Sequence, residues 1–294
     1  MINLTHYDLD GVVSHILLKK IMPDIQFVGC GYTKLENKFD EVLESDHHLV
    51  ITDLSLDQEH FNRLSAHKKK VLYIDHHKIP KKLIYGDNIT FYHNLKYCGA
   101  ANVMNYFKRK GYKFNDDLKR LVYLTNDYDL WLHKEKESLI LDFIFWKEQA
   151  DTFIRLFQDG IKQSVFDKYL FDYQRHMKRA EEYINECFKQ DVEFQGVKAI
   201  IIYASSYVNL ITRFINDYDI YFIVTSDIKM SLRIGDHADG NLENILNVVA
   251  DEECVEGAGC LEKAGGLVLK PDYNIENELI DLVEIMLSEY TIPF

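Results

Sequence analysis

Short apolar runs in the first half of the chain alternate with longer segments whose apolar residues recur at helical spacing. The runs at residues 1–4, 49–51 and 71–74 have the length and composition of buried β-strands, whereas the run at 121–124 fits either a short strand or the end of a helix. Helices are predicted at residues 11–20, 34–44, 58–67 and 99–110. Because strands that alternate with helices form parallel sheets with right-handed crossovers, the first half predicts an α/β domain.

The pattern changes at residue 138, where long helical segments without proline begin and continue to residue 190. A second region of strands and helices then starts near Asp191. It predicts strands at residues 197–203, 220–225, 229–234 and 266–269, and helices at residues 208–216, 242–250 and 275–287. A turn near Ser226-Asp227 predicts a hairpin between the second and third of these strands. We therefore expect two domains: residues 1–190, a parallel-sheet domain with a helical connector, and residues 191–294, a smaller α/β domain.

Acidic and histidine residues follow each apolar run in the first half. The groups are Thr5-His6-Tyr7-Asp8-Leu9-Asp10-Gly11, Ile51-Thr52-Asp53, Asp75-His76-His77 and Asn126-Asp127-Tyr128-Asp129. In open α/β sheets ligands bind beyond the carboxyl ends of the strands, so these side chains should converge at one edge. Carboxylates and imidazoles crowded together there require cations to neutralise them. Oxygen and imidazole ligands without thiolate favour Mn²⁺ or Mg²⁺ over Zn²⁺ or Fe²⁺.

The tripeptide Asp-His-His occurs twice, and strand polarity separates the two copies. Asp46-His47-His48 comes before the apolar run 49–51, at the amino end of a predicted strand. Asp75-His76-His77 comes after the run 71–74, at the carboxyl end and on the same edge as the other groups. The second copy is therefore predicted to belong to the functional site, and the first is predicted to be a solvated loop.

With 47% apolar and 28% charged residues, the composition agrees with a globular protein, and the chain is long enough for two cores. No run is long enough to span a membrane, and no basic segment followed by a hydrophobic one opens the chain. The five cysteines form no Cys-x-x-Cys pair, so we expect free thiols in a reducing cytoplasm. The net charge of −13 argues against binding long duplex nucleic acid but is compatible with a small phosphate-bearing substrate. A homodimer is compatible with the sequence.

The order of these motifs resembles the DHH phosphoesterase superfamily. The resemblance is carried by His6-x-Asp8-x-Asp10-Gly11, then Asp53, then Asp75-His76-His77, then a fourth acid at Asp127. The superfamily includes RecJ exonucleases, nanoRNases, cyclic-dinucleotide phosphodiesterases and family II pyrophosphatases. The opening motif and the segment Asn126-Asp127-Tyr128-Asp129-Leu130-Trp131 are most similar to the B-type nanoRNase (oligoribonuclease) branch.

The resemblance implies two Mn²⁺ ions, or Mg²⁺ or another divalent metal, about 3.5–4 Å apart. One ion would be held by His6, Asp8 and Asp53, and the other by Asp10, Asp53, His76 and Asp127. Asp53, alone after its strand and between the two acid groups, is the natural bridge. His77 would face the substrate as a donor to a phosphoryl oxygen, and Asp75 would orient an imidazole. Asp127 is preferred to Asp129 because it directly follows the apolar run.

The second half resembles the DHHA1 domain, which accompanies the DHH domain in RecJ and nanoRNase relatives. Ser231-Leu232-Arg233 is similar to that family's Ser-Leu-Arg strand, whose arginine contacts substrate. Residues 257–266 are similar to its glycine-rich loop, with a cysteine in place of the usual histidine; an ordinary turn is the alternative. The residues predicted to bind substrate are Arg233, Gly257, Gly259, Cys260, Gly265 and Gly266.

The function expected from these features is Mn²⁺-dependent hydrolysis of short oligonucleotides (nanoRNA) to mononucleotides by a hydroxide that two metals activate. One alternative is a phosphodiesterase for cyclic or linear dinucleotides or for the phosphorylated nucleotide pAp. A RecJ-like exonuclease is a further enzyme alternative, disfavoured because the sequence shows no oligonucleotide-binding barrel. A pyrophosphatase is also disfavoured, because the substrate-binding lysine-arginine pattern of that family is not matched. The alternative outside the enzyme class is a protein that sequesters a nucleotide, against which the complete set of acids argues.

Overall fold

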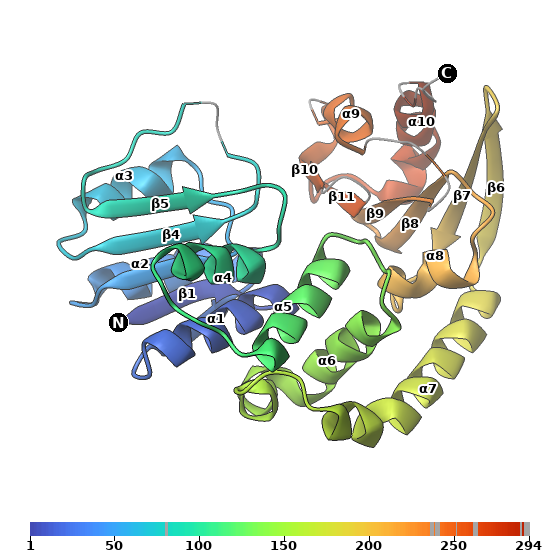
Figure 1. Cartoon of the computed structure of the whole chain (residues 1–294). Coiled ribbons are helices and arrows are strands. Elements are labelled where there is room, and N and C mark those ends of the chain that lie inside the picture. The colour runs from blue at the N-terminus through green and yellow to red at the C-terminus, as the bar shows by residue number, and fades with distance from the viewer. Residues whose placement is uncertain are drawn as a thin grey trace. The chain divides into compact units, whose positions relative to one another are not determined.

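The computed structural model describes residues 1–79, 82–235, 238, 242–250, 252–260, 264–288 and 290 (Figure 1). The chain divides into two compact units, Met1–Tyr173 and Gln174–Phe294. This division falls within the long helix α7 (Gln163–Glu186), all of which the sequence analysis assigns to the first domain. Each unit is built around its own sheet, and the predicted α/β fold class is confirmed.

The first unit contains a parallel sheet in the order β2-β1-β3-β4-β5. Its strands are β1 (Ile2–His6), β2 (Gln26–Cys30), β3 (Leu49–Thr52), β4 (Val71–Asp75) and β5 (Ile89–His93). The three central strands are the three predicted ones. The two edge strands were missed, because each has a single buried residue and lacks a continuous apolar run.

Helices cover both faces of this sheet. Their bounds are α1 (Leu9–Ile21), α2 (Leu35–Glu44), α3 (Gln58–Ala66), α4 (Gly99–Arg109), α5 (Asp116–Asp129) and α6 (Lys136–Phe157), with a 3₁₀ turn η1 (Tyr32–Lys34) before α2. Phe39 of α2 and Phe61 of α3 pack in one core with Tyr73 of β4. Strand residues alternate between faces, and Asn3 contacts α1 on the opposite side. The apolar run at 121–124 lies in α5, so it is helical.

A buried polar network ties the central strands together just before their carboxyl ends. Asn3 of β1 donates to the Thr52 hydroxyl at 3.0 Å, and that hydroxyl donates to Thr5 at 2.9 Å. His15 of α1 lies 3.1 Å from Asn3, through its Nδ1 atom. Burial, and then the charge of Lys19, lower the pKa of His15 to about 4, so its imidazole is neutral at physiological pH. The network fixes β1 against β3 immediately before His6 and Asp53.

The second unit contains a mixed sheet in the order β10-β11-β9-β8-β7-β6, in which β7 and β8 are parallel. Its elements are β6 (Lys189–Phe194), β7 (Val197–Tyr203), η2 (Val208–Leu210), α8 (Ile211–Phe214), β8 (Ile220–Ser226), β9 (Lys229–Ile234), α9 (Leu242–Asn247), β10 (Val255–Cys260), β11 (Ala264–Leu269) and α10 (Ile275–Ser288). The hairpin predicted between β8 and β9 is confirmed. The helix predicted at 208–216 is a 3₁₀ turn followed by a short helix.

Candidate metal centre

The carboxyl ends of β1, β3 and β4 bring acids and histidines together at one edge of the parallel sheet, as strand polarity predicts. His6 is the last residue of β1, Asp53 follows β3, and Asp75 is the last residue of β4. Within each of three overlapping groups, atoms able to bind a metal lie within 4.8 Å of one another. The groups are His6, Asp8 and Asp53; Asp10, His76 and Asp129; and Asp53, Asp75, His76 and His77.

Asp53 lies at the centre of this cluster and belongs to two of the groups. Its backbone φ is +54°, a left-handed conformation that non-glycine residues rarely adopt outside functional sites. The side chain is 1% exposed; its Oδ1 lies 3.2 Å from His76 Nε2, and its Oδ2 accepts no hydrogen bond. Burial, together with repulsion from Asp10, Asp8, Asp129 and Asp75, raises the pKa of Asp53 well above its usual range.

The three residues of the opening motif are positioned by helix ends. Asp8 caps α1 by accepting from the Gly11 N–H at 2.9 Å, and its other oxygen lies 2.6 Å from His6 Nδ1. Both oxygens of Asp10 accept from the first turn of α4, from the Gly99 N–H at 2.6 Å and the Ala100 N–H at 2.8 Å. A Cβ atom at Gly99 would come within 2.8 Å of Asp10 and 2.9 Å of Asp53, so glycine is required for this approach.

Asp75 orients His77, which is the role predicted for it. Its Oδ1 lies 2.9 Å from His77 Nδ1, and its Oδ2 accepts from the Tyr73 hydroxyl at 2.9 Å and from the His77 N–H. Burial opposes ionisation of Asp75, but the bond to His77 outweighs it and lowers the carboxyl pKa. Burial likewise disfavours protonated His77, yet Asp75 outweighs burial and raises the imidazole pKa. His77 is thereby held in one orientation with its protonated form favoured.

The structure corrects the choice between the two acids that end α5: Asp129, not Asp127, lies with Asp10 and His76. Asp129 Oδ2 is 3.7 Å from His76 Nε2. Asp127 is instead committed to the following turn, where it accepts from the backbone N–H groups of Lys134 and Glu135 and from the Ser138 hydroxyl. Helical periodicity does not separate the two acids, because Asp127 lies three residues beyond the buried Leu124 and Asp129 lies four beyond the buried Thr125.

Substitution of these two acids should produce opposite effects. Asp127→Ala should lower the free energy of unfolding by about 1–3 kcal/mol, because two part-buried backbone donors and the buried Ser138 hydroxyl lose their acceptor. Asp129→Asn should leave the melting temperature of the metal-free protein unchanged or higher, since burial and repulsion raise the pKa of Asp129 well above its usual range. It should also reduce the gain in melting temperature on adding Mn²⁺. Calorimetry with and without Mn²⁺ measures the stability of each variant and its gain in melting temperature on adding the metal. If only Asp127→Ala lost this gain, Asp127 and not Asp129 would be the metal-binding acid.

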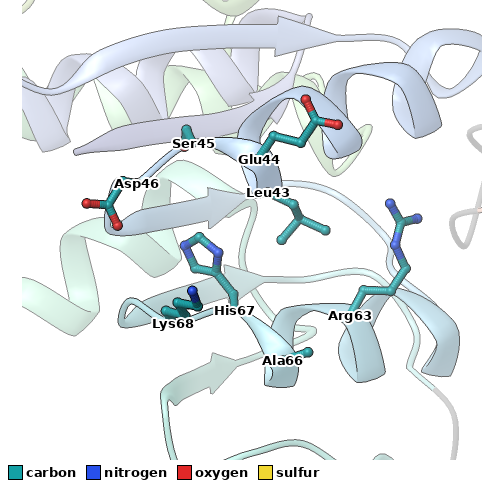
Figure 2. Close-up of a pocket in the computed structure, with 8 residues that line it drawn as sticks. All are labelled: Leu43, Glu44, Ser45, Asp46, Arg63, Ala66, His67 and Lys68. Carbon is teal, nitrogen blue, oxygen red and sulfur yellow. The ribbon is translucent and has the colours of Figure 1, made fainter.

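The first Asp-His-His copy lies at the amino end of β3, away from these groups. Asp46 forms an ion pair with Lys69 at 3.0 Å, and His48 Nδ1 accepts from the Lys70 N–H. Asp46 lines a shallow surface pocket with His67 and Lys68, between the ends of α2 and α3 (Figure 2). These contacts tie the loops before β3 and β4 together, so the copy has a structural role.

The donor atoms and the unsatisfied charge of the cluster fit divalent cations. The buried Oδ2 atoms of Asp53 and Asp129 accept no hydrogen bond, although buried carboxylates normally do. Both pKa values are raised first by burial and then by neighbouring carboxylates, a cost that a bound cation removes. Carboxylate oxygens and imidazole nitrogens are the ligands of Mn²⁺ and Mg²⁺ sites. The cluster is therefore a candidate site for divalent cations.

The sequence matches a known family over the segment that builds this cluster. Residues 2–125 match the DHH family, N-terminal domain. Members of the family are metal-dependent phosphoesterases that use divalent metals, which agrees with the donor set described above. No curated protein sequence matches the chain.

Solved structures share the fold of the DHH domain and of the unit that follows it. A pGpG-specific phosphodiesterase from Vibrio cholerae aligns with a TM-score of 0.60 at 13% identity, over 98% of this chain and 99% of that one. RecJ from Thermus thermophilus, solved with Mn²⁺, aligns with a TM-score of 0.63 at 14% identity over 99% of this chain. A structure of the same RecJ with Mg²⁺ gives a TM-score of 0.58 at 13% identity. The chain spans 52% and 50% of these two RecJ chains.

Beyond the DHH domain, the structure corrects the glycine-rich loop predicted at 257–266. Gly257, Gly259 and Cys260 lie in β10, and Gly265 and Gly266 lie in β11, with Gly259 paired to Gly266 and Cys260 to Gly265. A Cβ atom at Gly266 would lie 2.9 Å from the Met230 carbonyl oxygen, so this glycine permits β11 to approach β9. Residues 261–263, between β10 and β11 in the sequence, lie outside the described residues. Close approach of strands thus accounts for Gly266, and substrate binding by these residues stays a prediction.

Arg233 lies in β9 and is largely buried. One terminal nitrogen donates to the Leu232 carbonyl at 2.7 Å and the Ser231 hydroxyl at 2.8 Å, and the other donates to Asn209 Oδ1 at 2.7 Å. These bonds fix the guanidinium beside β11, and the Gly265 carbonyl also accepts from it. The sequence did not single out Asn209 as a partner, because the two residues are far apart in the chain.

The structure also bears on two other sequence features, the apolar segments and the cysteines. In the described part of the chain, no helix is both long and apolar enough to cross a lipid bilayer. Cys30, Cys98, Cys187 and Cys254 are free, which confirms the expected thiols for these four positions.

Proposed function

We propose that this protein is a divalent-metal-dependent phosphodiesterase that hydrolyses short oligonucleotides to mononucleotides. The observation that carries the proposal is the convergence of three acid and histidine groups around Asp53 in a DHH domain. In this proposal His6, Asp8 and Asp53 hold one cation, and Asp10, Asp53, His76 and Asp129 hold the other. Bound cations would supply Lewis acidity toward phosphoryl oxygens and lower the pKa of a coordinated water.

The protein's own contribution is orientation and charge. The backbone N–H groups in the first turn of α4 donate to both oxygens of Asp10. These bonds fix the orientation of the carboxylate that would bind the cation. Asp75 engages Nδ1 of His77, so the proton on Nε2 is the one that His77 can donate to a phosphoryl oxygen. The raised pKa of His77 increases the share of molecules that carry this proton at neutral pH.

Manganese is proposed as the working metal, with magnesium as the second choice, because the donors are oxygens and imidazoles. Short substrates are proposed because the chain carries a net charge of −13, which opposes binding along a long polyanion. In the second unit, Arg233 is proposed to bind a substrate phosphate as in DHHA1 relatives, with Asn209 and Ser231 holding its orientation.

A linear dinucleotide phosphodiesterase is the second candidate. It is favoured by the fold shared with the pGpG-specific enzyme over nearly the full length of both chains, a likeness of fold alone at 13% identity. A cyclic dinucleotide or pAp has less support, because no observed feature distinguishes either one. The two leading candidates differ in length preference: one enzyme cleaves RNA of two to five nucleotides, and the other cleaves dinucleotides and little else.

A substrate panel tests the proposal. Purified protein with Mn²⁺, Mg²⁺ or EDTA is assayed against RNA of two, three, five and about 25 nucleotides, linear and cyclic dinucleotides, pAp and pyrophosphate. We expect metal-dependent release of mononucleotides, with kcat/KM at least about tenfold higher on the short RNA than on the long one. Faster hydrolysis of pyrophosphate or long DNA would contradict the proposal. Tight nucleotide binding without any cleavage would indicate a sequestering protein instead.

A further inference from the structure

A chain of contacts beside the metal centre connects two of its ligand segments to an exposed tryptophan on α6. Tyr7 lies between the ligands His6 and Asp8, and its hydroxyl donates to Gln149 Oε1 at 3.1 Å. The Gln149 side-chain amide in turn donates to the Trp146 carbonyl at 2.6 Å. The contacts therefore run from the opening metal-binding motif directly to the backbone that carries Trp146.

The backbone of α6 is distorted at this point. Gln149 has φ +61° and ψ 170°, a conformation that glycine adopts readily and other residues almost never do. The helix is broken at Gln149, three residues after Trp146, and the Ala150 N–H beyond the break bonds to the Tyr7 hydroxyl. Strained conformations of this kind persist where surrounding contacts impose them, and they concentrate at ligand sites.

The Trp146 side chain is held in place although it is 51% exposed. Burial raises the pKa of Asp142, one turn earlier on α6, to about 7, although the neighbouring side chains of Tyr128 and Trp146 favour its charged form. The Trp146 ring packs edge-on against the fully buried Phe145, at a centroid distance of 4.9 Å. A large aromatic ring fixed at its edge while half its surface faces solvent is a stacking platform rather than a core residue.

We propose that Trp146 is the stacking platform for a nucleobase of the substrate whose phosphate lies at the metal centre. This inference rests on the proposed function and extends it, because it assigns recognition of the base to the first unit. Tyr7, Gln149 and Asp142 are positioning residues that set the platform against the metal-binding segments. Stacking accepts any base, so the site predicts little sequence preference and a strong dependence on the presence of a base.

Kinetics with abasic substrates test this role. A dinucleotide and its two singly abasic forms are compared on wild type, Trp146→Phe and Trp146→Ala. We expect Trp146→Ala to raise KM about 5- to 100-fold on the intact dinucleotide, Trp146→Phe to recover most of this loss, and the effect to vanish when one particular base is missing. Phe171→Ala, which removes another exposed aromatic (70% exposed), should change nothing. Equal losses on intact and abasic substrates would overturn the proposal.

Fluorescence tests the platform even if the chain proves not to hydrolyse oligonucleotides. The chain has two tryptophans, so Trp131→Phe leaves Trp146 as the single tryptophan fluorophore. With Mn²⁺ present, we expect a nucleoside monophosphate to quench this signal saturably and ribose 5-phosphate to leave it unchanged. Absence of quenching in a folded protein that binds Mn²⁺ would overturn the platform. Quenching without hydrolysis would instead retain the platform and remove the proposed reaction.

Discussion

Replacing Asp53 with alanine is expected to abolish hydrolysis of every phosphodiester substrate. Asp53 contributes to two of the ligand groups, and its strained backbone directs the carboxylate to the centre of the cluster. Its loss should therefore weaken binding of both cations rather than one. The rate on short RNA and on bis-p-nitrophenyl phosphate, measured at saturating Mn²⁺, should fall below a few per cent of wild type.

The stability of the same variant separates loss of metal from loss of fold. Burial and four neighbouring carboxylates raise the pKa of Asp53, so its charge destabilises the metal-free protein. Asp53→Ala should thus keep or raise the melting temperature without metal, and show a smaller rise when Mn²⁺ is added. Activity above a few per cent in a protein with this profile would contradict the bridging position of Asp53.

The second large effect is expected at the two histidines that follow β4. His76→Ala removes an imidazole that is 4% exposed and faces Asp53, Asp10 and Asp129, and His77→Ala removes the donor that Asp75 orients. Each should lower kcat on the order of 10²-fold or more. Mn²⁺ affinity should fall for His76→Ala and change little for His77→Ala, which isothermal titration calorimetry can measure.

The duplicated tripeptide provides the matched control. His47→Ala and His48→Ala change the same residue types in the same local sequence, but at the amino end of β3. Both should keep kcat and KM within about twofold of wild type, although His48→Ala removes the acceptor for the Lys70 N–H and should lower stability slightly. A large loss of kcat in either folded variant would refute the polarity argument.

Much of the metal centre was predictable because strand polarity is a strong constraint. Continuous apolar runs identify β1, β3 and β4, and parallel strands place their carboxyl ends on one edge. This suffices to bring His6, Asp53 and His76 together and to set aside His48. The contacts from the α4 N-terminus to Asp10 could not be predicted, because they join residues far apart in sequence through backbone groups that any residue has.

The errors have identifiable physical causes. Asp127 was preferred over Asp129 because it directly follows the apolar run, whereas its bonds to the turn after α5 join it to residues that the sequence does not connect with it. The glycines at 257–266 suggested a loop, yet most of them lie in paired strands, and at Gly266 the absence of a side chain permits β11 to approach β9. The strain at Gln149 has no sequence signal, because nothing marks a glutamine for a conformation favoured by glycine.

Anomalous diffraction from crystals soaked in Mn²⁺ tests the central claim most directly. The account predicts two peaks about 3.5–4 Å apart at the carboxyl ends of β1, β3 and β4. One should contact His6, Asp8 and Asp53, and the other should contact Asp10, Asp53, His76 and Asp129. Crystals of Asp53→Ala should show neither peak at full occupancy. Peaks bound by Asp127, peaks at Asp46-His47-His48, or no peak at the Asp53 cluster at saturating Mn²⁺ would contradict the account.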